Sequence, residues 1–200
     1  MLRVPSSVLK GAAVAVALCA LAAPGQAQAP RAPLEFYATI AVAGFEQPVE
    51  VRQSGLKRRL DVATGAVVQS FITDRTRGLM IVMSAAGRRR LALVFPAVIE
   101  EANAPLPLEF GQIQAGARLT RMGGSSVAGR GCALWRYAGY QGRSGTVCAG
   151  QDGLVLQMTP DGRQTPLFQV LSVSGAHQDS KWFVPPPDYQ ISVLPGVGGP

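Results

Sequence analysis

The sequence predicts a mainly β fold, an antiparallel sheet with one or two short covering helices. Three observations lead to this fold class. Short apolar or alternating runs fill residues 35–174, and turn signals such as Thr64-Gly65, Asp152-Gly153 and Asp161-Gly162 separate them. These signals recur about every 8–12 residues, which is typical of antiparallel β proteins. Finally, residues 79–83 are apolar in succession, as expected of a strand buried on both faces.

The first half of the chain is predicted to form six strands. Residues 48–53 show the alternation most clearly, with Val49 and Val51 on one face and Glu50 and Arg52 on the other. Gly55, Thr64-Gly65 and the segment 76–78 break the chain between runs. The expected strands cover residues 35–43, 48–53, 56–62, 66–74, 79–84 and 89–95.

A short helix is predicted over residues 96–103. Pro96 suits the first turn of a helix, Val98 and Ala102 lie at helical spacing, and Pro105 would end it. Residues 104–116 are rich in proline and glycine, so they are expected to form a loop or a second short covering segment.

The second half returns to strands. A short strand at 118–122 is followed by residues 123–131, which fit either a loop or a bulged strand. A glycine-rich turn at 139–143 and the two Asp-Gly signals then separate further runs. The expected strands are 118–122, 132–137, 145–149, 154–159 and 167–174, and Pro185 to Pro187 are expected to end the regular structure.

Residues 79–83 (Leu-Met-Ile-Val-Met) constrain function as well as fold. Alternate side chains of a strand point to opposite faces, so both faces here are apolar. The second face needs a cover, which can be ordinary packing by a helix or a curled sheet, or an apolar ligand. Both explanations stay open from sequence alone.

The first 27 residues are typical of a secretory signal peptide. Arg3 and Lys10 precede an apolar run at 11–23, and Gly25 and Ala27 suit a cleavage site. The run is shorter than the roughly 18–20 residues that span a bilayer, and no transmembrane segment is expected in the mature chain. We therefore predict a periplasmic protein with a signal peptide at 1–27, a linker at 28–34, one domain at 35–194 and a flexible tail at 195–200.

Charge and cysteine content narrow the function classes. The formal net charge is +7, and export together with sparse aromatic residues argues against nucleic acid as the partner. The excess charge fits a solvated basic surface or attraction to an anionic membrane surface.

Cys132 and Cys148 are expected to form a cross-strand disulfide, directly opposed across a hairpin centred on Tyr140.

The sequence offers little for catalysis. His177 is the single histidine, Asp179 does not form a triad with it, and no Gly-x-Ser-x-Gly surrounds the nearby serines. His177 is therefore interpreted as a surface or capping residue. We expect no catalytic residues, no metal site and no cofactor.

Three segments together resemble a family of small exported Gram-negative proteins with no assigned function. They are Arg58–Asp61 with Ile72–Met80, then Cys132–Arg136 with Gly145–Cys148 and Asp152–Leu156, and finally Phe183–Tyr189. Members look like the lipoprotein-carrier fold of LolA and LolB. The resemblance implies a strongly curved antiparallel half-barrel whose concave face holds an acyl chain or another apolar ligand. It supplies no catalytic residues.

The leading hypothesis is a non-enzymatic periplasmic binding protein for an apolar ligand, such as a lipid or a lipoprotein acyl chain. The alternative is a structural or sensor-type interaction module that contacts an envelope protein through a sheet edge. Which sheet face is concave stays open at this stage. The candidate ligand-lining residues are Phe71, Met80, Val82, Leu93, Phe95 and Trp135.

Overall fold

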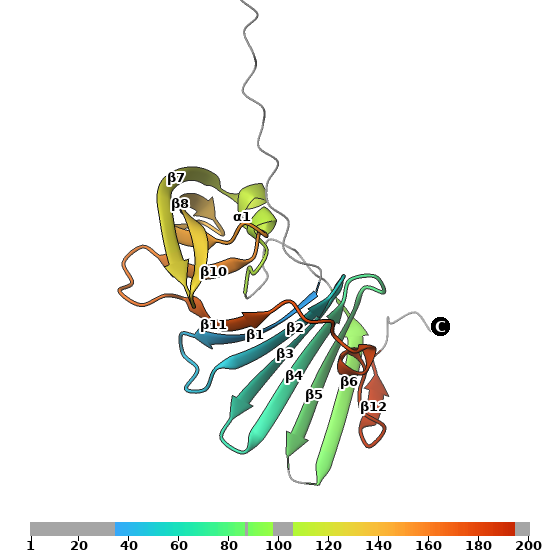
Figure 1. Cartoon of the computed structure of the whole chain (residues 1–200). Coiled ribbons are helices and arrows are strands. Elements are labelled where there is room, and N and C mark those ends of the chain that lie inside the picture. Colours follow the sequence, from blue (N-terminus) through green and yellow to red (C-terminus); the bar gives the residue numbers. More distant parts are fainter. Residues whose placement is uncertain (1–34, 87, 98–105, 195–200) are drawn as a thin grey trace, which may run out of the picture.

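One continuous sheet organises the chain in a computed structural model that describes residues 35–86, 88–97 and 106–194. The sheet has 12 strands in the order β12-β6-β5-β4-β3-β2-β1-β11-β10-β9-β8-β7. All neighbouring pairs are antiparallel except β12 with β6. Figure 1 shows the β7–β10 end turned up against the broad β1–β6 part, which gives the sheet one concave side. The predicted mainly β fold class is confirmed.

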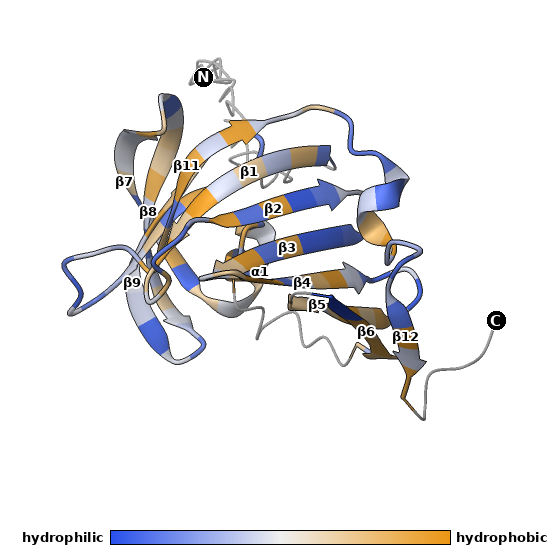
Figure 2. Ribbon diagram, turned by 90° about the horizontal axis from the view of Figure 1, so that it is seen from below, coloured by the Kyte–Doolittle hydropathy of each residue, from blue (hydrophilic) through white to orange (hydrophobic). Residues whose placement is uncertain are grey.

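The first six strands form a meander, since each pairs with the next. Side chains alternate as the sequence predicts: Val49, Val51 and Gln53 are buried while Glu50 and Arg52 lie on the opposite face. Figure 2 shows this alternation as hydrophobic and hydrophilic bands along β1 to β4. The strands are β1 (Glu35–Val42), β2 (Val49–Ser54), β3 (Lys57–Thr64), β4 (Val67–Asp74), β5 (Leu79–Ala86) and β6 (Arg89–Pro96).

A second meander joins the first where β11 pairs with β1. Its first strand is longer than predicted, because residues 123–127 continue it after a register shift between Arg121 and Gly123. Of the two expectations for 123–131, the bulged strand fits. The strands are β7 (Arg118–Val127), β8 (Arg130–Tyr140), β9 (Arg143–Ala149), β10 (Val155–Pro160) and β11 (Phe168–Ser174).

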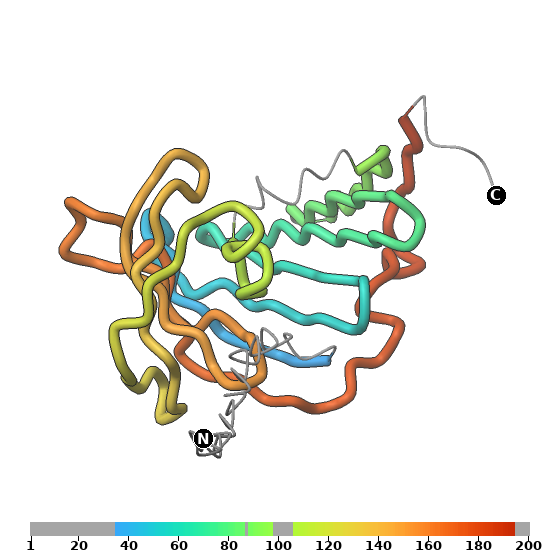
Figure 3. Tube along the Cα trace, turned by 90° about the horizontal axis from the view of Figure 1, so that it is seen from above, coloured from blue at the N-terminus to red at the C-terminus, as the bar shows by residue number. Residues whose placement is uncertain are grey.

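The described α-helix lies after the segment for which the first helix was predicted. Pro96 is the last residue of β6, and residues 98–103 of that prediction lie outside the described part of the chain. The helix α1 (Phe110–Gly116) falls in the segment expected to be a loop or a second covering segment. Figure 3 shows α1 lying over the sheet on its concave side.

Segment 106–113 fills the concave face at one half of the sheet. Leu106, Leu108, Phe110 and Ile113 are buried among side chains of β1, β2 and β8–β11. We call this region, with the strands β1, β2 and β7–β11, the covered half. The strands β3–β6 form the open half.

The C-terminal segment was expected to be irregular after Pro185, and that prediction was wrong. A 3-10 helix, η2 (Ser180–Phe183), is followed by a four-residue strand, β12 (Gln190–Val193), which pairs parallel with β6. All four residues of β12 are exposed, so the strand lacks the buried alternation by which strands are recognised.

The disulfide between Cys132 and Cys148 is present, but its predicted register was wrong. Leu134, not Cys132, is the partner of Cys148 across β8 and β9. The chain turns at Gln141 and Gly142, which both have positive φ, and a bulge lies between Ala138 and Tyr140. The two cysteines are therefore diagonal neighbours on one face, with Cα atoms 5.6 Å apart.

Candidate ligand-binding face

Five of the six predicted lining residues lie together on the concave face of the open half. The strand register places Phe71 beside Val82 and Val82 beside Leu93, and it pairs Met80 with Phe95. Because opposed residues in a sheet point to the same face, these side chains form one apolar surface across β4, β5 and β6.

The surface is open over the described residues. Leu93 is 42% exposed and its neighbour on the same face, Leu91, is 45% exposed, while Phe71, Met80, Val82 and Phe95 are half-buried. Contiguous apolar side chains on a sheet face are unusual without a cover, and they commonly mark a binding surface. The arrangement suits contact with a flexible apolar chain more than with a polar ligand.

Trp135, the sixth candidate, lies elsewhere. Cross-strand pairing from β8 through β11 puts it on the same concave face, since Trp135 pairs with Val147 and Val147 with Met158. It belongs to the covered half, and its ring lies 5.5 Å from that of Phe110 at the start of α1. Trp135 thus packs under the helix, and six strands, from β3 to β9 in the sheet order, separate it from the nearest of the other five on β4.

A polar cluster joins the two halves on this concave face. Arg58 of β3 donates to Oε1 of Gln53 at 2.7 Å and to Oε1 of Glu109 at 2.7 Å. Arg75 reaches the same Glu109 oxygen at 3.1 Å. Burial lowers the pKa of the Arg58 guanidinium, and the Glu109 carboxylate opposes that shift. Because Glu109 directly precedes α1, this cluster fixes the covering segment to the open half.

Sequence reasoning did not find this cluster. Arg58 and Glu109 are 51 residues apart, and no local spacing connects them. Alternation along β3 puts Arg58 on the same face as Leu60 and Val62, but only the structure shows that this inward arginine has a distant carboxylate partner.

The opposite face of the open half is covered by the chain itself. Phe183 of η2 packs against Ile72, Met83 and Ala92, with Ile81 close by. We call residues 175–194 the C-terminal strap. The strap therefore covers one face of the doubly apolar strand 79–83, and the concave face is the side that is left half-exposed by the described residues.

Arginine side chains hold the strap in place. The Arg52 guanidinium lies 4.3 Å from the ring centroids of both Tyr37 and Trp182, a stacked arrangement on two aromatic faces. Arg59 donates to the Trp182 carbonyl at 3.0 Å and also pairs with Asp61. These contacts explain why the outward face of β2 and β3 is rich in charge.

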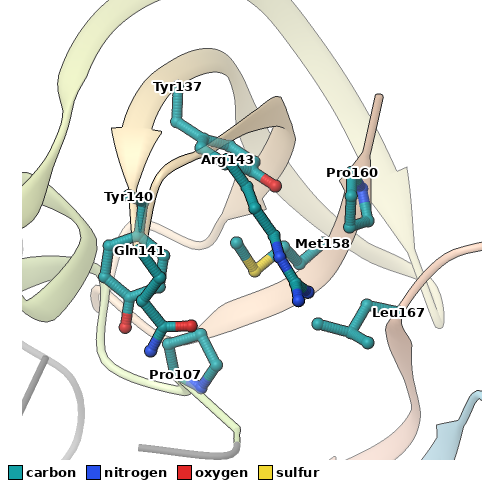
Figure 4. A pocket seen from close by; sticks show the side chains of 8 residues that line it. All are labelled: Pro107, Tyr137, Tyr140, Gln141, Arg143, Met158, Pro160 and Leu167. Carbon is teal, nitrogen blue, oxygen red and sulfur yellow. The ribbon is translucent and has the colours of Figure 1, made fainter. Parts of the chain in front are cut away.

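A small pocket lies at the far end of the covered half (Figure 4). Its volume is about 20 Å³, enough for one water molecule. Tyr137 and Tyr140 line it, and their buried hydroxyls have no hydrogen-bond partner in the described part of the chain. Burial raises the pKa of both phenols. A buried water would satisfy one of these hydroxyls, so this pocket fits hydration and not the predicted apolar ligand.

Groups suited to catalysis are scattered in the part of the chain that the structure describes. His177 is exposed, with Nδ1 at 2.7 Å from Oε2 of Glu35. Within residues 35–86, 88–97 and 106–194, no three His, Cys, Asp or Glu side chains gather as a metal site would require. Over the same ranges, no helix has the length and apolar character to cross a membrane.

The geometry defines a mainly β protein with an open, curved sheet. No protein-family model and no curated protein matches the chain. Among solved structures, the chain is similar to MucB at 16% identity and a TM-score of 0.48, over 77% of this chain and 58% of that one.

Two complexes of MucB are similar as well. The MucA/MucB complex of Pseudomonas aeruginosa matches at 16% identity and a TM-score of 0.47, over 80% of this chain and 58% of that one. MucB in complex with MucA(peri) matches at 14% identity and a TM-score of 0.37, over 80% and 57%. The chain thus spans less than two thirds of each matched structure. At these TM-scores and identities, no ligand or partner of the matched proteins can be assigned to this chain.

Proposed function

We propose that this protein is a non-enzymatic periplasmic binding protein that holds an apolar ligand, such as a lipid or a lipoprotein acyl chain. The observation that supports this most directly is the half-exposed apolar surface of Phe71, Met80, Val82, Leu93 and Phe95 on the concave face. A half-barrel of the LolA and LolB type is the architecture that the proposal implies.

The shape of the surface favours an acyl chain. Its side chains come from three neighbouring strands, which lie about 4.8 Å apart, so the surface is roughly as wide as two strand spacings. An acyl chain lying across the surface would bury apolar area, and each Å² buried would contribute about 25 cal/mol to the free energy of binding. The disulfide of Cys132 and Cys148 supports the periplasmic location, because such bonds persist in oxidising compartments.

A fluorescent fatty acid tests the proposal. The exported protein should bind cis-parinaric acid. Val82→Gln should weaken this binding about tenfold or more, because the glutamine amide would contact the acyl chain without a hydrogen-bond partner. Val68→Gln is the matched control, since Val68 is exposed on the opposite face of β4. Equal binding by the two variants would contradict the proposal.

Native mass spectrometry of protein from its own periplasm separates the proposal from its rival. A co-purifying lipid supports a carrier. A lipid-free chain bound to a protein would support an interaction module of the envelope, as MucB is found in complex with MucA.

A further inference from the structure

The sheet ends in a strand pair whose exposed side chains are apolar and basic. On β12, Ile191 is 54% exposed and Val193 is 61% exposed, and Leu194 just beyond it is 46% exposed. Leu91 of β6 is exposed on the other face of the same edge. Figure 2 shows the hydrophobic residues at β6 and β12. We call these four residues, together with Arg88 and Arg89, the β6–β12 edge.

Positive charge lies at one end of this edge. Arg88 lies in the turn between β5 and β6, Arg89 and Arg90 begin β6, and all three are exposed. Arg90 pairs with Asp188. In the described part of the chain, Arg88 and Arg89 have no carboxylate partner within ion-pair distance. Because Gln190 lies beside Leu91 in the register, this basic turn and the start of β12 are neighbours.

From these observations we propose that the β6–β12 edge docks the protein on the surface of an anionic lipid bilayer. Exposed aliphatic side chains next to unpaired arginines match the two components of such a surface, the acyl boundary and the anionic head groups. A second copy of the chain fits less well, because the chain from residue 28 onward carries 17 basic and 12 acidic residues and would repel itself.

The outer backbone of β12 limits how deeply the edge can enter. β12 is the last strand of the described sheet, so the backbone groups on its outer side have no strand partner among the described residues. Such groups cannot enter the hydrocarbon core, but head groups and water satisfy them at the interface. The edge therefore lies at head-group depth, and the open half beside it would receive or release its ligand there.

Vesicle co-sedimentation with the exported protein tests this docking surface. The protein should bind vesicles that contain phosphatidylglycerol and bind poorly to phosphatidylcholine vesicles, with affinity falling as salt rises. Arg88→Ser combined with Arg89→Ser should weaken binding about thirtyfold, which corresponds to about 1 kcal/mol for each basic residue near the surface. Ile191→Ser combined with Val193→Ser should also weaken binding.

Matched control variants test whether vesicle binding depends on this edge or only on net charge and exposed apolar area. Arg77→Ser with Arg163→Ser removes the same charge from two other exposed turns, and Val68→Ser with Leu171→Ser removes exposed apolar residues elsewhere. Both controls should bind like the parent protein. Equal losses in edge and control variants would overturn the proposal. So would equal binding to both vesicle types, or sedimentation showing a dimer that the β12 variant abolishes.

This docking proposal rests in part on the proposed ligand-binding function, and the measurements keep them apart. The edge variants should retain cis-parinaric acid binding, since they leave Phe71, Val82 and Leu93 unchanged. Val82→Gln should in turn retain vesicle binding, so either proposal can fail while the other stands.

Discussion

In the covered half of the sheet, the concave face is closed by segment 106–113, whose apolar side chains Leu106, Leu108, Phe110 and Ile113 are buried. In the open half, the concave face carries half-exposed apolar residues, and the buried cluster is on the opposite face under the C-terminal strap. Both halves are thus packed by a segment distant in sequence, but on opposite faces. The doubly apolar strand β5 therefore has one face packed by the strap and one face that is half-exposed among the described residues.

Matched leucines should show the largest difference between the halves. Leu108 is 0% exposed in the covered half, and Leu93 is 42% exposed in the open half. We expect Leu108→Ala to lower the free energy of unfolding by about 2–5 kcal/mol, because it leaves a cavity. Leu93→Ala should cost less than about 1 kcal/mol. Urea denaturation measures both, and similar losses would show that the concave face of the open half is packed.

Removal of the disulfide is expected to cause the next-largest loss of stability, and the bond lies entirely within the covered half. The bond closes a loop with a sequence separation of 16, for which chain entropy predicts about 3 kcal/mol of stabilisation. Replacing both cysteines by serine should lower stability by about that amount while the circular dichroism spectrum stays that of a β protein. Labelling of two free thiols in the native exported protein would contradict the bond itself.

The ion pair that joins the halves should contribute less. Glu109→Gln removes the carboxylate that holds Arg58 at 2.7 Å, where the two side chains are 16% and 23% exposed. We expect a loss of about 1–3 kcal/mol, since a largely buried guanidinium would keep only a neutral partner. Glu50→Gln is the control, because its partner Arg52 is held at 3.2 Å by a carboxylate that is 45% exposed. That change should cost under about 1 kcal/mol.

The sequence predicts the features that depend on residues close together in the chain, and it misses those that depend on contacts between distant segments. The eleven expected strands are local patterns of alternation and turns, and each is present in the structure. Grouping Phe71, Met80, Val82, Leu93 and Phe95 was also possible, since neighbouring hairpins fix their register. β12 was missed because it is short and exposed, so its identity as a strand depends on a partner about 100 residues away.

Long-range placement explains the other differences. Trp135 was predicted to line the ligand site with the other five residues, and the strand order places it on β8, beside Phe110 of α1. The cysteine register differs because the chain turns at Gln141 and Gly142, beyond Tyr140, on which the predicted hairpin was centred. The Arg58–Glu109 contact and the strap follow from how distant segments meet, which a single sequence does not encode locally.

The smallest effect is expected at His177, where the strap leaves the covered half. The hydrogen bond from His177 lowers the pKa of the exposed Glu35 carboxyl, so Glu35 stays ionised to lower pH in the folded chain than in the unfolded chain. The contact therefore stabilises the fold above the unfolded pKa of about 4.3, and this stabilisation is lost as pH falls through the folded value.

His177→Ala should return the pKa of Glu35 toward its usual range in a carboxyl NMR titration. It should leave cis-parinaric acid binding unchanged, because His177 lies outside the concave surface. The pKa of the Asp179 carboxyl should change less, because the Lys181 amide, which donates to it at 2.9 Å, lowers that pKa most and His177 contributes least. Loss of ligand binding with folding intact would mean that His177 has a functional role, and it would return catalysis to consideration.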